Sequence, residues 1–352
     1  MRYLVAILAL ALAGCGGGRV LSLPPAGTDT GQAAPQARQA AATVAGGPTL
    51  YVAGQDRVAA FALGASGYAT AQRTISGFYR ASARVEFYEL NRLAAIGTTA
   101  DGTLYTIIDT RSGHDVFDCV IEVFGPTADG NAPARTPYCT GSIPAAIVGR
   151  PSGAIDFLSA SYETDDQVAR IQANGARVVR AALPGFITHF GMAEDAAANA
   201  YVTAINPYRV DEYTTTGVVL TSAPARSIAM RAQPGAIALA PDGTMYVAIR
   251  IPSAAYDAFT SFVEVVAPGG TSVAREIGPF SNQIGALAVD SAGELFVGIS
   301  APDSVTKVKV FAPNATGSAT PLRVLQNPLP PTGPAGVDGA AIVGLAIAEP
   351  WQ

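Results

Sequence analysis

A repeated order of four short strand signals constrains the fold of this chain more than any other feature. The first signal of each repeat is small and apolar and recurs about every 45–52 residues. It begins at Leu93, Ala145, Gly191, Gly235 and Gly285. A turn, often Asp-Gly-like, then an aromatic-bearing strand and two further strands follow in fixed order. The recurrence indicates stacked units of one kind that bury their faces against one another.

Five complete copies of this unit lie between about residues 85 and 327. The aromatic-bearing strands read "LYTIID", "IDFLSA", "AYVTAI", "MYVAIR" and "LFVGIS". In the copy that begins with "GMAEDAAANAYV", the Asp-Gly turn is missing, and we expect the fourth strand at "VVLTSA" (Val218–Ala223). Aromatic residues recur in the second and third strands of the copies, and we expect them to pack between units.

The two ends of the repeat region complete a sixth copy. "TLYVAG" (Thr49–Gly54), "RVAAFAL" and "ATAQRTI" are second, third and fourth strands without a first strand, and "AIVGLAIAE" (Ala341–Glu349) is a first strand with nothing after it. Joining them closes a ring and removes two unpaired edges. We therefore expect an all-β, six-bladed β-propeller with four-stranded blades over residues 49–350, closed by N- and C-terminal strands that share one blade.

Two segments carry a family resemblance: "GAIALAPDGTMYVAI", and "GALAVDSAGELFVGI" with "VKVFAPNATG". They resemble the NHL-repeat pattern, and the resemblance extends over about residues 49–349. It implies a six-bladed β-propeller scaffold of the kind that gluconolactonase-like and streptogramin-lyase-like enzymes share. It also implies that the loops before first strands and between second and third strands gather on one face around the channel.

The N-terminus is predicted to be a targeting segment. Arg2 precedes a short apolar run that ends in "LAGC" (Leu12–Cys15), which resembles a bacterial lipobox. We expect a signal peptide over residues 1–14, lipidation such as palmitate on Cys15, and a flexible tether to residue 48. The alternative is an ordinary signal peptide that happens to abut a cysteine. The predicted location is the bacterial cell envelope, at the outer membrane if the source is Gram-negative.

The two remaining cysteines, Cys119 and Cys139, flank a turn-rich segment centred on Asp129. If the flanking segments pair as a hairpin about this centre, the cysteines lie directly opposite each other. A cross-strand disulfide is then expected in an oxidising compartment. The alternative is two free thiols.

The net charge of −5 argues against nucleic acid as a partner, since a nucleic-acid surface is basic. Known catalytic fingerprints are absent from the sequence, and we assign no catalytic residue. Candidate ligand or metal positions at the channel face are Asn91, His189, Glu194, Asn282 and Asp338.

Three functional readings remain open. The first is a non-catalytic binding or scaffolding module, for an envelope protein or a small ligand, with no resident cofactor. The second is a metal-dependent lactonase or lyase that uses the channel mouth, for which a divalent cation such as Ca²⁺ would be needed. The third is a purely structural envelope protein, with the polar loops serving only as a solvated acidic rim.

Overall fold

The computed structural model describes residues 47–349, apart from gaps at residues 77, 79–89, 113–115, 133–137, 140–142, 151, 161–164, 174, 185–188, 253–258, 301–305 and 331–340. Every regular element in this part of the chain is a β-strand. Among these residues there is no helix of the length and hydropathy that a bilayer span requires. Cys15 and Asp338 lie outside the described residues.

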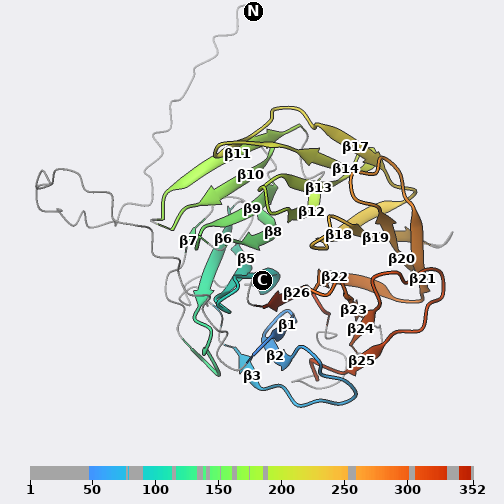
Figure 1. Cartoon of the computed structure of the whole chain (residues 1–352). Helices are drawn as coiled ribbons and strands as arrows, with labels where there is room; N and C mark the ends of the chain where they lie inside the picture. Colours follow the sequence, from blue (N-terminus) through green and yellow to red (C-terminus); the bar gives the residue numbers. More distant parts are fainter. Residues whose placement is uncertain are drawn as a thin grey trace, which may run out of the picture. The chain divides into compact units, whose positions relative to one another are not determined.

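Six four-stranded antiparallel sheets are arranged as the blades of a β-propeller (Figure 1). The inner strands are β26 (Gly344–Ala348), β4 (Leu90–Thr98), β8 (Ile143–Gly149), β12 (His189–Glu194), β18 (Gln233–Leu239) and β22 (Gln283–Val289). The second strands are β1 (Thr49–Ala53), β5 (Leu104–Ser112), β9 (Ile155–Ala160), β13 (Ala200–Ile205), β19 (Met245–Pro252) and β23 (Leu295–Ser300). Each inner strand contacts the inner strand of the next blade around the ring.

Third and fourth strands complete each blade toward the outside. The third strands are β2 (Val58–Ala62), β6 (Val116–Phe124), β10 (Asp166–Ile171), β14 (Tyr208–Tyr213), β20 (Phe259–Val266) and β24 (Lys307–Phe311). The outer strands are β3 (Arg73–Ile75), β7 (Tyr138–Cys139), β11 (Arg177–Leu183), β17 (Arg226–Ala229), β21 (Arg275–Phe280) and β25 (Arg323–Gln326). We call the side where inner strands begin the entry face, and the opposite side the turn face.

The ring is closed by strands from the two ends of the chain. β1 pairs with β26 from Thr49 opposite Ala348 to Ala53 opposite Gly344, and on its other side it pairs with β2. In Figure 1, β26 lies beside β1 at the centre of the ring. The predicted six-bladed fold with one shared blade is therefore confirmed.

One predicted strand is wrong. Val218–Ala223 does not form the outer strand of its blade: Val219 and Leu220 form β16, which pairs only with β15 (Thr215–Thr216) in a separate hairpin. The outer strand is β17, which pairs with β14. The inserted hairpin carries β-prone Thr and Val residues around a glycine, so its local pattern imitates the expected strand.

The turn between inner and second strands is the same five-residue device in five blades. In Thr99–Thr103, the first residue donates to the fifth carbonyl at 3.0 Å, and Gly102, at φ +81°, donates back to the first at 2.9 Å. The blade without an Asp-Gly turn makes the same turn, with Ala198 at φ +69° in the glycine position. Asp195 supports it by accepting the Asn199 amide at 2.9 Å.

An aromatic residue three positions after this turn residue packs between blades. Tyr105, Tyr246 and Phe296 occupy the position and are buried. In the blade β8–β11 the same position is Asp156, which lies opposite Arg170 as Tyr105 lies opposite Val123. The predicted packing role of the aromatics is confirmed, but one blade uses a carboxylate where its neighbours use a ring.

Glycines in three of the turns between third and outer strands link neighbouring blades. Gly317 donates to the Glu276 carbonyl at 2.7 Å and accepts from the Gly278 amide at 2.9 Å. Gly67 and Gly130 form the same parallel bridge to Leu325 and Ile75. All three have positive φ, as the bridge requires. The shared layout of these repeats thus encodes contacts between blades.

Candidate functional site

The central channel holds a cavity of about 310 Å³ to which all six inner strands contribute. Its lining residues are almost all small or aliphatic, and Gln283 supplies the one polar side chain among them. Small residues are required here because six strands converge on one axis. They are Ala94, Ala95, Ile96, Ala145, Ala146, Ile147, Phe190, Gly191, Met192, Gly235, Ala236, Ile237, Gln283, Ile284, Gly285, Ala286, Leu287, Val343, Gly344 and Leu345.

The inner strands that form the channel wall do not pair as a regular β-ladder. In five inner strands the pairing register shifts at a similar level, which marks a β-bulge. A bulge leaves one residue outside the ladder, so its backbone N–H and C=O groups are not used by the ladder, although the Gly235 carbonyl accepts a hydrogen bond from Thr203. The bulged residues all line the cavity: Ala94, Ala145, Phe190, Gly235, Ala236 and Gly285. The channel therefore combines apolar side chains with a ring of backbone polar groups.

Two positions in this wall must be glycine because the next blade approaches them closely. A Cβ on Gly285 would overlap the carbonyl oxygen of Ile342, and one on Gly191 would overlap the carbonyl oxygen of Gly235. Gly235 itself is different, because the nearest atom to its Cβ would be 3.9 Å away. A Cβ at Gly235 would therefore make no more than ordinary van der Waals contact.

Phe190 is the one aromatic side chain of the cavity wall and is 39% exposed. It is the extra residue of the bulge in β12, whose ladder passes from His189 directly to Gly191. The hydroxyl of Thr203 accepts from the Gly191 amide at 2.8 Å and donates to the Gly235 carbonyl at 3.0 Å. This hydroxyl holds the bulge against the next blade, so Phe190 is presented to the channel from a fixed backbone.

At the entry face, His189 and Asp166 form a buried pair. Nδ1 of His189 lies 2.8 Å from Oδ2 of Asp166, and both residues are about 2% exposed or less. The His189 amide also donates to the same carboxylate at 3.2 Å. Asp166 begins β10 and His189 begins β12, so the pair ties two adjacent blades together. This geometry is that of a structural pair, with the imidazole turned away from solvent.

A second polar pair stands at the entry of β18. Arg250 donates to the side-chain carbonyl of Gln233 at 2.8 Å, and its guanidinium lies 4.7 Å from the centre of the Phe259 ring. Stacking on the ring restricts the orientation of the guanidinium. This pair was not among the predicted sites, although Gln233 immediately precedes a small-residue strand of the kind used to find the others.

Four of the five predicted site residues lie in the described part of the chain, and Glu194 is at the opposite end of the blades from the other three. Asn91 lies in β4 and Asn282 directly before β22, both at the entry face. Glu194 ends β12 at the turn face, the end of the strand opposite to His189. Among the described residues, no three His, Cys, Asp or Glu side chains converge as metal ligands would. A calcium site at these positions stays a prediction.

Glu194 belongs instead to a buried ionic cluster at the turn face. Its carboxylate contacts Arg150 and Arg180, while Asp156 receives two hydrogen bonds from Arg170 at 2.7 Å and one from Arg150. Arg180 has no exposed side-chain surface and also donates to the Ala198 carbonyl at 2.8 Å. Sequence reasoning missed this cluster, although Asp156 at an aromatic position was a visible signal.

The pKa values of the two carboxylates in this cluster are shifted in opposite directions. Burial acts to raise the pKa of Asp156, but the hydrogen bond from Arg170 and the charge of Arg180 outweigh it and lower this pKa. Burial and the charge of Asp156 raise the pKa of Glu194 to about 8, against the pull of Arg180 and Arg150. Three guanidinium groups already surround Glu194 and Asp156, which makes this a poor position for a cation.

The expected register of the cysteine hairpin is wrong by one residue. Cys139 in β7 lies opposite Val120 of β6, and Tyr138 lies opposite Ile121. On its other side β6 places Cys119 opposite Asp109. The pairing therefore lies one residue away from the symmetric arrangement about Asp129. The disulfide itself stays a prediction without that geometric premise.

Comparison with known proteins supports the fold and no more. No family model matches the sequence, and no curated protein matches it. A protein of unknown function from Bacteroides caccae is similar in structure, with a TM-score of 0.58 and 9% identity over 86% of this chain and 99% of its own. A functionally unknown protein from Desulfotomaculum acetoxidans has a TM-score of 0.52 and 15% identity over the same shares.

A named protein is also similar in structure. TolB from Acinetobacter baumannii has a TM-score of 0.54 and 9% identity, covering 86% of this chain and 67% of its own. At such identities the likeness supports the six-bladed β-propeller architecture only. The NHL-repeat resemblance stays a prediction.

Proposed function

We propose that this protein is a non-catalytic binding module of the bacterial cell envelope, anchored by a lipid on Cys15, whose ligand binds in the central channel. The observation that carries the proposal is the cavity of about 310 Å³ shared by all six inner strands. Its volume falls at the lower end of the ~300–1,000 Å³ typical of small-molecule sites.

The lining indicates a small, uncharged ligand. Among the described residues that line the cavity none carries a charge, and a charged group placed beside them would lose its hydration without gaining an ionic partner from them. An apolar group of the ligand would pack against Phe190 and the aliphatic wall. Polar groups would bind Gln283 and the backbone groups released at the bulges. This arrangement supports recognition, and the described lining residues include no nucleophile or acid–base pair.

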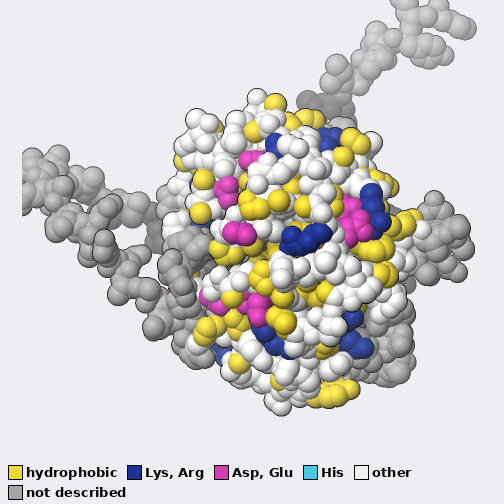
Figure 2. All heavy atoms as spheres, turned by 45° about the vertical axis from the view of Figure 1, so that its right-hand side comes forward, with side chains coloured by type: hydrophobic (Ala, Val, Ile, Leu, Met, Phe, Trp, Pro, Cys, Tyr) yellow, Lys and Arg dark blue, Asp and Glu magenta, His cyan; other side chains and the backbone are white. Residues whose placement is uncertain are grey.

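On the side shown in Figure 2, neither positive nor negative charge dominates the surface outside the channel. There, acidic and basic side chains of the described residues are interspersed among hydrophobic and uncharged atoms. Such a surface suits a protein in which specificity lies in concave sites. The channel cavity is also larger than a second cavity, of about 160 Å³, on the turn face.

Binding of a neutral apolar dye tests the channel proposal. N-phenyl-1-naphthylamine fluoresces more strongly in an apolar site, and we expect saturable binding by the wild-type protein. Gly235→Leu should abolish the signal because Gly235 lines the cavity and has room for a Cβ, so the larger side chain would occupy part of the binding space. Gly64→Leu, on an exposed loop between β2 and β3, is the matched control and should bind as the wild type does. Absence of saturable binding, or equal binding by both variants, contradicts the proposal.

Lipid anchoring needs a separate test. Wild-type protein should incorporate labelled palmitate and sediment with membranes, whereas Cys15→Ser should do neither. Membrane sedimentation of Cys15→Ser at the wild-type level would contradict the anchor and leave the channel proposal intact.

A further inference from the structure

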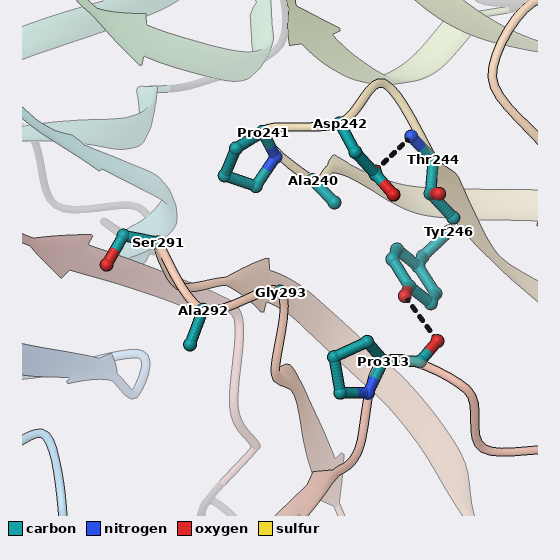
Figure 3. A pocket seen from close by; sticks show the side chains of 9 residues that line it. All are labelled: Ala240, Pro241, Asp242, Thr244, Tyr246, Ser291, Ala292, Gly293 and Pro313. Atoms are coloured by element: carbon teal, nitrogen blue, oxygen red, sulfur yellow. Dashed lines mark hydrogen bonds between the residues drawn. The ribbon is translucent and has the colours of Figure 1, made fainter. Parts of the chain in front are cut away.

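A second cavity lies on the turn face between the blade β18–β21 and the blade β22–β25 (Figure 3). Its volume is about 160 Å³, the space of roughly five water molecules at ~30 Å³ each. This volume admits one side chain and is too small for most free ligands. The lining residues are Ala240, Pro241, Asp242, Thr244, Tyr246, Ser291, Ala292, Gly293 and Pro313.

The walls of this pocket are fixed by hydrogen bonds. Oδ1 of Asp242 accepts from the Thr244 amide at 2.8 Å, which holds the carboxylate at the pocket edge. The buried Tyr246 donates its hydroxyl to the Pro313 carbonyl at 3.2 Å, so its ring is held as part of the wall. Figure 3 shows Pro241, Asp242 and Thr244 along one edge of the space, Tyr246 joined to Pro313 by a hydrogen bond, and Ser291 and Ala292 across from Tyr246.

The charge around the pocket is negative. Asp242 is exposed, and on the opposite wall Glu349 accepts the Ser291 amide at 2.7 Å. Burial and the charges of Glu294 and Glu349 raise the pKa of Asp290, the residue that begins this wall. Two basic groups lie nearby: Arg323 is paired with Glu294 at 2.7 Å, whereas Arg275 donates to the carbonyls of Pro313 and Ala315 and keeps its positive charge, so the four carboxylates outnumber the two guanidinium groups.

We propose that this pocket binds a single arginine or lysine side chain of a partner polypeptide. The aliphatic stem would pack between Tyr246, Pro241 and Pro313, and the cationic head would meet the carboxylate of Asp242. Arginine is the better fit because its flat guanidinium stacks on an aromatic ring. The pocket lies on the face opposite to the channel entry, so this binding does not depend on the channel proposal.

Titration with a minimal ligand tests the proposal on the folded, full-length protein. N-acetyl-L-arginine amide is added to isotope-labelled protein while amide resonances are followed by NMR. We expect saturable shifts at residues 242–244 and 291–293. The matched probe is N-acetyl-L-citrulline amide, which has nearly the same shape without the charge. It should produce shifts at least several-fold smaller at the same concentration. Equal shifts from both probes would overturn the proposal.

Three variants locate the binding. Asp242→Asn removes the charge and keeps an oxygen for the Thr244 amide, and it should weaken binding about five-fold. Asp101→Asn is the matched control, because Asp101 accepts the Thr103 amide at 3.0 Å in the equivalent turn of another blade. It should bind as the wild type does. Ala292→Leu fills the pocket with all charges retained and should abolish the shifts. Full binding by Ala292→Leu, or equal loss in both Asp variants, would overturn the proposal.

Discussion

Two junctions between blades solve the same packing problem with different chemistry. At the Tyr246 junction, between β18–β21 and β22–β25, a buried aromatic ring packs between the blades and Gly317 forms a backbone bridge. At the Asp156 junction, between β8–β11 and β12–β17, a carboxylate takes the aromatic position. There the hairpin β15–β16 covers the outside, and Arg180 donates to the Val218 carbonyl at 3.1 Å.

The two junctions differ in how the stabilising free energy is divided among their contacts. The Tyr246 junction gains from many small apolar contacts and single hydrogen bonds, none of which is indispensable. In the Asp156 junction, the two carboxylates and the Arg180 guanidinium are buried, and the partly exposed Arg150 and Arg170 complete the ionic cluster. Removing one charge there leaves the others buried without a partner, which costs more than the pair itself contributes.

The largest expected effect comes from removing one charge of the cluster. Asp156→Asn should lower the free energy of unfolding by about 3–5 kcal/mol because three guanidinium groups then share one carboxylate. Tyr246→Phe, at the equivalent position of the other junction, removes one hydroxyl and should cost about 1 kcal/mol. Urea unfolding of both variants measures the two values. Similar losses in the two variants would show that the junctions do not differ in this way.

The pH dependence of stability should come from the same cluster. The pKa of Glu194 rises from its ordinary 4.5 to about 8 in the folded chain. Between these values the folded state binds more protons than the unfolded state, so the free energy of unfolding falls as the pH rises. The slope reaches at most about 1.4 kcal/mol per pH unit.

The substitution Glu194→Gln should flatten this slope between about pH 4.5 and 8. Asp242→Asn, at the Tyr246 junction, should leave it unchanged. Asp156 acts in the opposite sense, since its lowered pKa stabilises the fold above its ordinary 3.8 and this contribution is lost on acidification. Denaturant midpoints measured across the pH range check these expectations. An undiminished slope in Glu194→Gln would assign the pH dependence to other groups.

The backbone bridge of the Tyr246 junction can be weakened without introducing a clash. A Cβ on Gly317 would meet nothing within 4 Å, but its φ of +56° is strained for any residue with a side chain. Gly317→Ala should therefore cost about 1–2 kcal/mol. Gly64→Ala is the control, because that site is equally open and lacks a positive φ. Equal stability of both variants in urea would refute a role for the bridge geometry.

The smallest expected effect is a gain at the Asp156 junction. Ala198 adopts a φ of +69° at the turn position where four other blades have glycine. Ala198→Gly should raise the free energy of unfolding by about 0.5–1 kcal/mol by relieving this strain. Differential scanning calorimetry should show a slightly higher Tm. A lower Tm would mean that Ala198 contributes more through packing than it loses through its backbone.

The fold could be predicted because its signals are local and repeated. "IDFLSA", "AYVTAI" and "LFVGIS" coincide with β9, β13 and β23. The outer strand β17 was misplaced because an inserted Thr- and Val-rich hairpin has the same local pattern as a blade strand. The cysteine register differed by one residue because the midpoint of a sequence segment does not fix how its flanking strands pair.

The candidate sites were harder to predict because they depend on distant residues. The ionic cluster joins Arg150 to Glu194 across two blades, and a single sequence does not show which charges meet. The channel cavity depends on bulges that leave no residue signature apart from small side chains. Asp156 could have been singled out, since it stands three residues after Gly153 where Tyr105 and Tyr246 follow their own turns.

The pairing of β1 with β26 also sets a constraint during synthesis. β1 ends at Ala53, and its inner partner begins only at Gly344, so almost the whole domain is translated before the first blade can be completed. Until then one edge of β1 is open to pairing with other chains. If synthesis stops late, or if a protease removes β26, the product has five complete blades and one unpaired strand edge. Completion of this fold therefore depends on β26.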